Sequence, residues 1–188
     1  MGKMRKFHYY NYIGIFNIIF ILLATALSLL VSNGVDFRSH PISALGADIK
    51  GGIYFNGGLI MFAILQVFFA LILCHKAKSG VVPKVFFVVG GLFLVLAGYF
   101  QYGIYTSLHN WFGTLCALFV ATGIMMISRS LFKKSSLLQY FVYASLVSVI
   151  ASFFLQDALL GARWEILMVI GITAWNVILS IPLIKHRA

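Results

Sequence analysis

Residues 36–58 read DFRSHPISALGADIKGGIYFNGG and form the longest polar segment in a chain that otherwise consists of apolar runs. The segment holds Asp36 and Asp48, two of the four acidic residues of the protein, together with His40 and Pro41. Because a proline disfavours helical geometry at the residue before it, the His40–Pro41 pair predicts a break in the helical structure. We therefore expect a loop here, with long apolar helices on both sides of it.

The remainder of the chain is apolar enough to lie in lipid, since 62% of its 188 residues are hydrophobic and 10% are charged. A helix needs about 20 apolar residues to cross a bilayer. We predict an all-α integral membrane protein, a compact bundle of six transmembrane helices that forms a single domain over residues 1–188. The predicted spans are about 10–32, 53–74, 85–105, 109–128, 137–156 and 164–184.

The basic residues predict the orientation of this bundle. Eleven of the fourteen Lys and Arg residues fall in the termini and loops on one side of the predicted membrane. Such an excess is typical of the cytoplasmic side, so we expect both termini inside and residues 36–58 outside the cell membrane. The net charge of +10 also attracts anionic lipid headgroups. Because the basic residues are dispersed over short loops, nucleic acid is not expected as a partner.

Two predicted spans carry small residues at intervals of four. In lipid, such stripes allow helix backbones to approach closely. They predict packing within the bundle, against a partner subunit, or against a second copy of the chain. The stripes are Gly113, Ala117 and Ala121 in the fourth span and Ala144, Ser148 and Ser152 in the fifth.

Four polar side chains fall well inside the predicted spans, roughly 18–22 Å below the outer helix ends at about 1.5 Å per residue. An unpaired amide in hydrocarbon is costly, so we expect these residues to face inward and to bond one another. They would form either a structural network or part of a path for a small solute. The four residues are Asn17, Gln66, Thr122 and Asn176.

The outer end of the bundle is expected to be richer in reactive side chains. Glu165 opens the sixth span, where the helix dipole favours an acid, whereas Asp157 closes the fifth span, where the dipole disfavours one. Asp157 should therefore need a partner such as Arg163, His109 or a bound cation. We expect an outward-facing polar pocket beneath the loop, to which His40, Ser43, Asn56, Gln101 and Tyr102 also belong.

Several kinds of site are compatible with these residues. Imidazole and carboxylate groups suit zinc, which His40, His109, Asp157 and Glu165 would hold, although no tight ligand spacing supports this site. Haem held by His40 and His109 is a further alternative, and the sequence names no cofactor. The simplest alternative is that these groups cap helices and bind lipid headgroups.

An acid–base site is the remaining alternative. His109 would act with Asp157 or Glu165, and Ser43 would serve as a possible nucleophile. The substrate would be held by the polar residues around them, which are His40, Asn56, Gln101, Tyr102 and Arg163.

The order of these features resembles a known family. Residues 41–46 read PISALG, residues 55–59 read FNGGL, His109 opens a span, and residues 161–165 read GARWE before the last span. This layout resembles the prokaryotic six-span membrane family known as domain of unknown function 998, over essentially the whole chain. Members commonly carry Glu-Arg before the last span, where this chain reads Trp-Glu-Ile at residues 164–166.

The loop and the histidine are also similar, more loosely, to eukaryotic six-span proteins of the damage-regulated autophagy modulator kind. Those proteins are associated with lipid remodelling and membrane trafficking. The resemblance implies that membrane lipids are partners. It also implies that one site is formed by Pro41, Ser43, Gly46, Asn56 and His109.

These observations lead to one expected function and two alternatives. We expect the outward-facing pocket to bind or process a lipid or amphiphile at the outer leaflet. The first alternative is a non-enzymatic accessory or scaffold subunit that packs through the small-residue stripes. The second is a small-solute permease that uses the Asn17, Gln66, Thr122 and Asn176 layer as a midway site.

Overall fold

The computed structural model describes residues 12–32, 35–36, 40–131, 139–140, 143–144, 147 and 164–185. Every regular element in this part of the chain is helical. Most of the predicted fifth span, residues 137–156, lies outside the described residues, as does Asp157. The elements are α1 (Ile13–Val31), the 3₁₀ helix η2 (Ile42–Ala47), α2 (Gly52–Lys76), α3 (Val81–Tyr99), α4 (Thr106–Leu131) and α6 (Trp164–Lys185).

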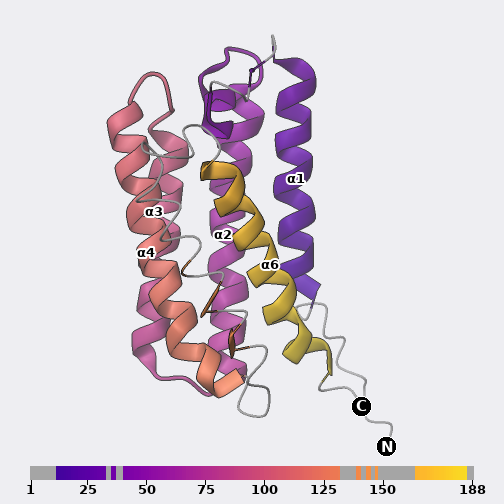
Figure 1. Cartoon of the computed structure of the whole chain (residues 1–188), viewed down its shortest axis with the longest axis vertical. Coiled ribbons are helices and arrows are strands. Elements are labelled where there is room, and N and C mark those ends of the chain that lie inside the picture. The colour runs from indigo at the N-terminus through magenta and orange to yellow at the C-terminus, as the bar shows by residue number, and fades with distance from the viewer. Residues whose placement is uncertain are drawn as a thin grey trace, which may run out of the picture.

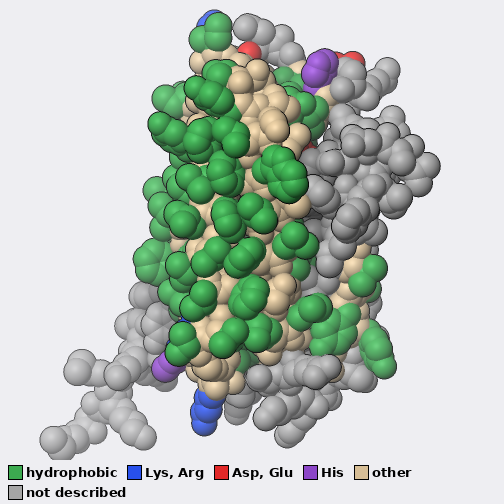
Figure 2. Space-filling view, turned by 90° about the vertical axis from the view of Figure 1, so that its left-hand side faces the viewer, with side chains coloured by type: hydrophobic (Ala, Val, Ile, Leu, Met, Phe, Trp, Pro, Cys, Tyr) green, Lys and Arg blue, Asp and Glu red, His purple; other side chains and the backbone are tan. Residues whose placement is uncertain are grey.

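Four of these helices are long and apolar enough to cross a membrane: α1, α2, α3 and residues 106–128 of α4. Only 28–39% of the most apolar stretch of each helix is buried inside the protein. On the face shown in Figure 2, hydrophobic side chains run from one end of the molecule to the other, and charged side chains gather at the ends. Such a surface is stable in contact with lipid, and the chain is a multi-pass membrane protein.

Helix α3 ends earlier than the sequence predicts. The predicted span of 85–105 is wrong at its end, because the helix stops at Tyr99 and residues 100–105 turn toward α4. Gly103 within this turn has a φ of +88°, a left-handed conformation that glycine adopts without a steric penalty. Helices α2 and α4, in contrast, extend beyond both ends of their predicted spans.

The helices form an antiparallel bundle (Figure 1). Helices α3 and α4 make the most extensive contact, α2 packs on α3, and α1 packs on α2. Helix α6 crosses α2 and contacts α1. The start of α1 and the end of α6 lie at the same end of the bundle as the α2–α3 connection. We call this the basic end, since Lys76, Lys78 and Lys84 lie there, and we call the opposite one the strap end.

The α3–α4 interface depends on close backbone approach and on aromatic packing. A Cβ atom on Gly90 would lie 2.8 Å from a methyl carbon of Val120, so only glycine allows this separation of the helices. One turn away, the rings of Phe93 and Phe119 are 5.4 Å apart in an edge-on arrangement, which adds to the stability of the contact. Helices α3 and α4 therefore pack tightly against each other along this interface.

A cluster of buried hydrophobic residues lies toward the basic end and joins four helices. Of the predicted small-residue stripes, Ala121 belongs to this cluster and Ala117 packs against it, whereas a Cβ on Gly113 would meet open space. Ala144 is exposed, and Ser148 and Ser152 lie outside the described residues. The cluster consists of Phe69, Ala70, Leu73, Cys74, Phe87, Ala121, Ile124, Ile127, Trp175 and Leu179.

Candidate functional site at the strap end

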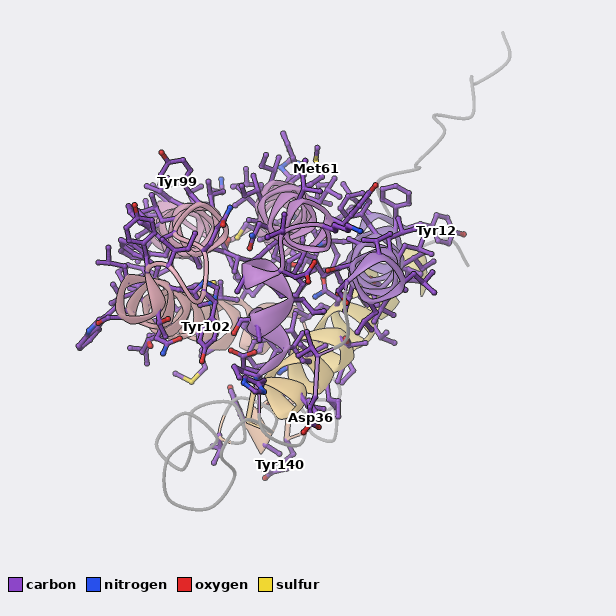
Figure 3. All side chains as sticks on the ribbon, turned by 90° about the horizontal axis from the view of Figure 1, so that it is seen from above. Tyr12, Asp36, Met61, Tyr99, Tyr102 and Tyr140 are labelled. Atoms are coloured by element: carbon purple, nitrogen blue, oxygen red, sulfur yellow. The ribbon has the colours of Figure 1, made fainter. Side chains whose placement is uncertain are left out.

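Residues 41–51, which we call the strap, lie across the end of the bundle with η2 over its centre (Figure 3). Pro41 precedes η2 in an extended conformation. At the other end of the strap, the Asp48 carboxylate accepts hydrogen bonds from the backbone N–H groups of Lys50 (2.9 Å) and Gly51 (2.6 Å). These local bonds turn the chain from the strap into α2, as aspartate side chains commonly do.

The strap is fastened by a carboxylate that lies 122 residues away in the chain. Glu165, in the first turn of α6, accepts the backbone N–H of Ser43 at 2.8 Å and the Ser43 hydroxyl at 2.8 Å. The backbone N–H of Ile42 also interacts with this carboxylate. Glu165 is only 8% exposed and Ser43 is 3% exposed. The carboxylate thus caps the amino end of η2 and holds it against α6.

The opposite end of η2 is held by α2. The Asn56 side-chain N–H donates to the Gly46 carbonyl at 2.9 Å, and Ser28 of α1 donates to the Gly51 carbonyl at 2.8 Å. A Cβ on Gly46 would lie 2.6 Å from Asn56 Oδ1, so the side chain fits only against a glycine. Asn56 Oδ1 itself has no donor among the described residues. The strap is therefore hydrogen-bonded to three helices, α1, α2 and α6.

His109 connects α4 to the end of α3. Its Nδ1 atom lies 2.8 Å from the carbonyl oxygen of Ala97 and 3.2 Å from that of Phe100. Both neighbours are acceptors, so Nδ1 carries a proton and donates it. These carbonyls are among the last of α3, and a histidine that binds them stabilises the helix end.

Tyr102 and Glu165 complete the surroundings of His109. The rings of Tyr102 and His109 are 5.8 Å apart and nearly perpendicular, and His109 interacts electrostatically with Glu165. Burial, and next the negative charge of Glu165, raise the pKa of the Tyr102 phenol. In Figure 3, Tyr102 points toward the strap, whereas Tyr99 points away from the bundle.

The structure thus brings five of the predicted site residues to one place. His40 is exposed, and the only bond described for Gln101 is made by its backbone carbonyl, which accepts from Tyr105. Asp157 and Arg163 lie outside the described residues. The residues that come together are Ser43, Asn56, Tyr102, His109 and Glu165.

The described residues contain no group of three His, Cys, Asp or Glu side chains that could hold a metal. Glu165 and the Nδ1 atom of His109 are already engaged with protein donors and acceptors, and Ser43 donates its hydroxyl to Glu165. What this arrangement does chemically is satisfy buried polar groups and fix the strap to the helices. The predicted zinc ligands also include Asp157, which lies outside the described residues.

The predicted polar layer inside the membrane is only partly formed. The bond expected within it exists between Asn17 and Gln66, at 2.7 Å. Asn176 faces inward as predicted, since it is 1% exposed. The predicted bonds within the layer are wrong for the Thr122 hydroxyl and the Asn176 amide, which donate to carbonyls of their own helices, those of Leu118 and Ile172. The depth of a polar side chain in the membrane does not predict its hydrogen-bond partner, because the side chain can also bond a backbone carbonyl one turn away in its own helix.

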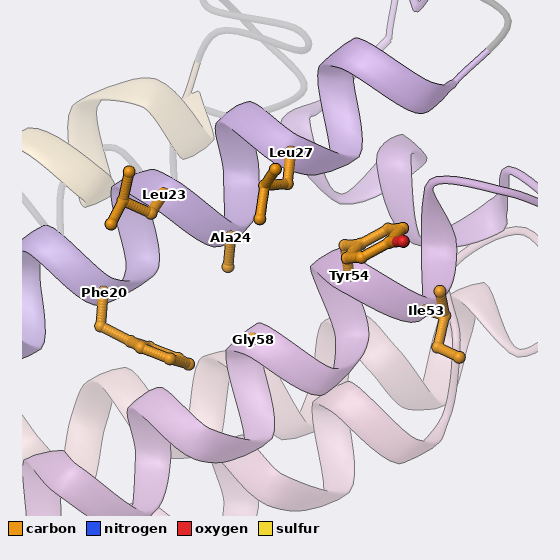
Figure 4. A pocket seen from close by; sticks show the side chains of 7 residues that line it. All are labelled: Phe20, Leu23, Ala24, Leu27, Ile53, Tyr54 and Gly58. Atoms are coloured by element: carbon orange, nitrogen blue, oxygen red, sulfur yellow. The ribbon is translucent and has the colours of Figure 1, made fainter.

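A feature that sequence reasoning missed is an apolar groove of about 390 Å³ between α1 and α2 near the strap end (Figure 4). At its floor the helices approach so closely that a Cβ on Gly58 would overlap that of Ala24. The small residues Ala24 and Gly58 are the feature of the sequence that could have predicted this close approach. The groove is lined by Phe20, Leu23, Ala24, Leu27, Ile53, Tyr54 and Gly58.

Comparison with known proteins places this architecture in context. A family model described as protein of unknown function (DUF998) matches residues 17–182, from α1 into α6. No curated protein and no solved structure matches the chain. The similarity to damage-regulated autophagy modulator proteins stays a prediction.

Proposed function

We propose that this chain, which belongs to the DUF998 family, binds a phospholipid whose acyl chain lies in the α1–α2 groove. The observation that supports this function is the groove itself. Its volume of about 390 Å³ falls within the ~300–1,000 Å³ typical of ligand pockets. Both helices that form it are candidate membrane spans, so the medium outside the groove is lipid.

The chemistry of the lining favours an acyl chain over a polar solute. Leu23 and Ile53 are 58% and 74% exposed and stand at its sides, while Ala24 and Gly58 form the floor. A polar solute would find few hydrogen-bond partners there, whereas an acyl chain gains contact with the apolar side chains along the groove.

The strap end of the groove suits a phosphate-bearing headgroup. Tyr54 lines the groove and is 45% exposed, and the exposed Lys50 lies four residues before it in the chain. A tyrosine at a membrane–water interface places its ring in lipid and its hydroxyl in the polar layer. The lysines at the basic end support an orientation in which the strap faces the outer leaflet.

The proposed function is binding rather than processing. Ser43, the expected nucleophile, is 3% exposed, and both its hydroxyl and its amide are engaged by Glu165. The buried residues of the strap end therefore act as the fastening that keeps α1, α2 and α6 in place beside the groove. His109, in the same way, stabilises the end of α3.

Native mass spectrometry in detergent with added phosphatidylglycerol or phosphatidylcholine tests this function. We expect the wild type to retain one phospholipid, and Leu23→Trp, which fills the groove, to raise the Kd for that phospholipid about tenfold, equivalent to ~1.4 kcal/mol. The matched control is Leu22→Trp, because Leu22 is similarly exposed, at 51%, but does not line the groove.

Three results would overturn the proposal. Equal retention by the wild type and Leu23→Trp would show that the groove does not hold the lipid. Equal loss in Leu23→Trp and Leu22→Trp would show unspecific lipid contact. A wild type that retains no phospholipid would favour the scaffold alternative.

A further inference from the structure

A second polar region lies in the membrane half nearer the basic end, where α1 packs against α6. A Cβ on Gly14 of α1 would lie 2.5 Å from the Ser180 hydroxyl oxygen of α6, so the two helices are in close contact at this level. We call this contact the α1–α6 seam. It lies far from the strap along both helices, and none of its residues lines the groove, so the seam is independent of the proposed lipid site.

Helix geometry places two buried asparagines at nearly the same level of α1 and α6. Asn17 lies three residues beyond Gly14, and Asn176 lies four residues before Ser180. Because the two helices are antiparallel (Figure 1), both steps lead toward the strap end, by about 4.5 Å and about 6 Å at ~1.5 Å per residue. Residues three or four apart share a helix face, so Asn176 lies on the face of α6 that contacts α1, and Asn17 lies on the face of α1 that contacts both α6 and α2.

Each of these asparagines has one satisfied and one unsatisfied side-chain atom. The Asn17 amide donates to Gln66 Oε1 at 2.7 Å, and the Asn176 amide donates to the Ile172 carbonyl at 2.9 Å. The Oδ1 atoms of both residues are buried, and no donor among the described residues lies within hydrogen-bond distance of either. Asn17 is 0% exposed and Asn176 is 1% exposed, so bulk solvent does not reach them.

The two unsatisfied oxygen atoms lie at a similar level of the bundle, and each requires a hydrogen-bond donor. A buried carbonyl oxygen without a donor costs roughly 1–3 kcal/mol, and lipid supplies no donor. A water molecule has two O–H groups and is neutral, which matches both the number of acceptors and the charge of the seam. Hard cations instead take about six or more oxygen ligands, commonly with carboxylates, and the described acids Asp36, Asp48 and Glu165 lie at the strap end.

We infer that a buried water molecule bridges Asn17 Oδ1 and Asn176 Oδ1 and links α1 to α6. Since Asn17 also bonds Gln66, the bridge extends a hydrogen-bonded chain from α2 through α1 to α6. It gives α6 a polar attachment to the bundle in addition to its apolar contacts at Trp175 and Leu179.

The direct test is an experimental structure at a resolution that shows ordered water. We expect density for one water within about 2.6–3.2 Å of both Oδ1 atoms. A direct Asn17–Asn176 amide contact, a cation at this position, or a seam without water density would each overturn the inference.

Stability measurements provide a second test. We expect Asn17→Leu and Asn176→Leu each to lower the Tm by roughly 2–6 °C, from the loss of a bridged bond. The double variant should lose less than the sum of the two, because one substitution already removes the bridge.

The matched control pairs Asn17→Leu with Thr122→Val, because the bond described for the Thr122 hydroxyl is to the Leu118 carbonyl of its own helix. These two effects should add. Additive losses for the two asparagines would contradict a shared water.

Discussion

The strap end and the α1–α6 seam both bury polar side chains, yet they satisfy them differently. At the strap, Glu165 accepts two bonds from Ser43, a residue 122 positions away, and Asn56 donates to the Gly46 carbonyl. In the seam, the Asn17 amide donates to the Gln66 side chain, and the Asn176 amide donates to the Ile172 carbonyl of its own helix.

The difference arises from the backbone. The strap is short and tightly turned, so the first N–H groups and last carbonyls of η2 remain available to side chains from other helices. In the seam, both backbones are regular α-helix, and their N–H groups are already bonded within the helix. Side chains must then find one another or water, which leaves orphan oxygens such as Asn17 Oδ1. The irregular backbone of the strap thus supplies partners to side chains from other helices, while Asn56 Oδ1 at the strap end has no donor among the described residues, like the two oxygens of the seam.

The largest expected effect comes from removing the fastening of the strap. Glu165→Leu should lower the free energy of unfolding by roughly 2–5 kcal/mol, because it leaves the Ser43 N–H and hydroxyl buried without an acceptor. Thermal unfolding in detergent measures this change. Ser43→Ala is the control and should cost only about 1 kcal/mol, since it removes one donor together with its bond. Equal costs would show that the carboxylate does not hold the backbone.

A clash at the other end of η2 should have the next largest effect. Gly46→Ala should cost about 1–3 kcal/mol, because the new methyl group would overlap Asn56 Oδ1. Gly57→Ala is the matched control, since a Cβ at Gly57 in α2 meets nothing within 4 Å. It should be neutral or stabilise by up to ~1 kcal/mol, as alanine favours helix. A neutral Gly46→Ala variant would show that the strap is loosely held.

The His109→Phe variant distinguishes a structural role of His109 from a role in lipid binding. We expect a loss of about 1–2 kcal/mol, because the last carbonyls of α3 lose their donor. Phospholipid retention by native mass spectrometry should stay at the wild-type level. Lost retention at unchanged stability would instead support the predicted role of His109 as an acid, base or ligand.

The smallest change in stability is expected at Thr122, which the sequence predicts to lie at the same depth as the buried amides. Thr122→Val should change the free energy of unfolding by less than about 0.5 kcal/mol, since among the described residues the hydroxyl bonds the Leu118 carbonyl of its own helix. Unfolding titration beside Asn17→Leu measures the contrast. A cost for Thr122→Val as large as that for Asn17→Leu would restore the continuous layer predicted from the sequence.

Much of the framework could be predicted before the structure was known. Apolar length identifies the membrane helices, because each needs a run of residues that lipid can surround. The bond between Asn17 and Gln66 also followed from depth, since two amides at one level in neighbouring spans have few other partners. The grouping of Ser43, Asn56 and His109 at one end followed from their places at the ends of helices.

The sequence by itself thus determined the helical, membrane-embedded character of the chain and placed Asn17 and Gln66 at one level. Only the tertiary structure decided that Glu165 binds Ser43, that Asn176 leaves an oxygen toward the α1–α6 seam, and that α1 and α2 enclose a groove. The reason is that hydrophobic length and rise per residue are local properties of a segment. The rotation and spacing of one helix against another depend on contacts between segments far apart in the chain.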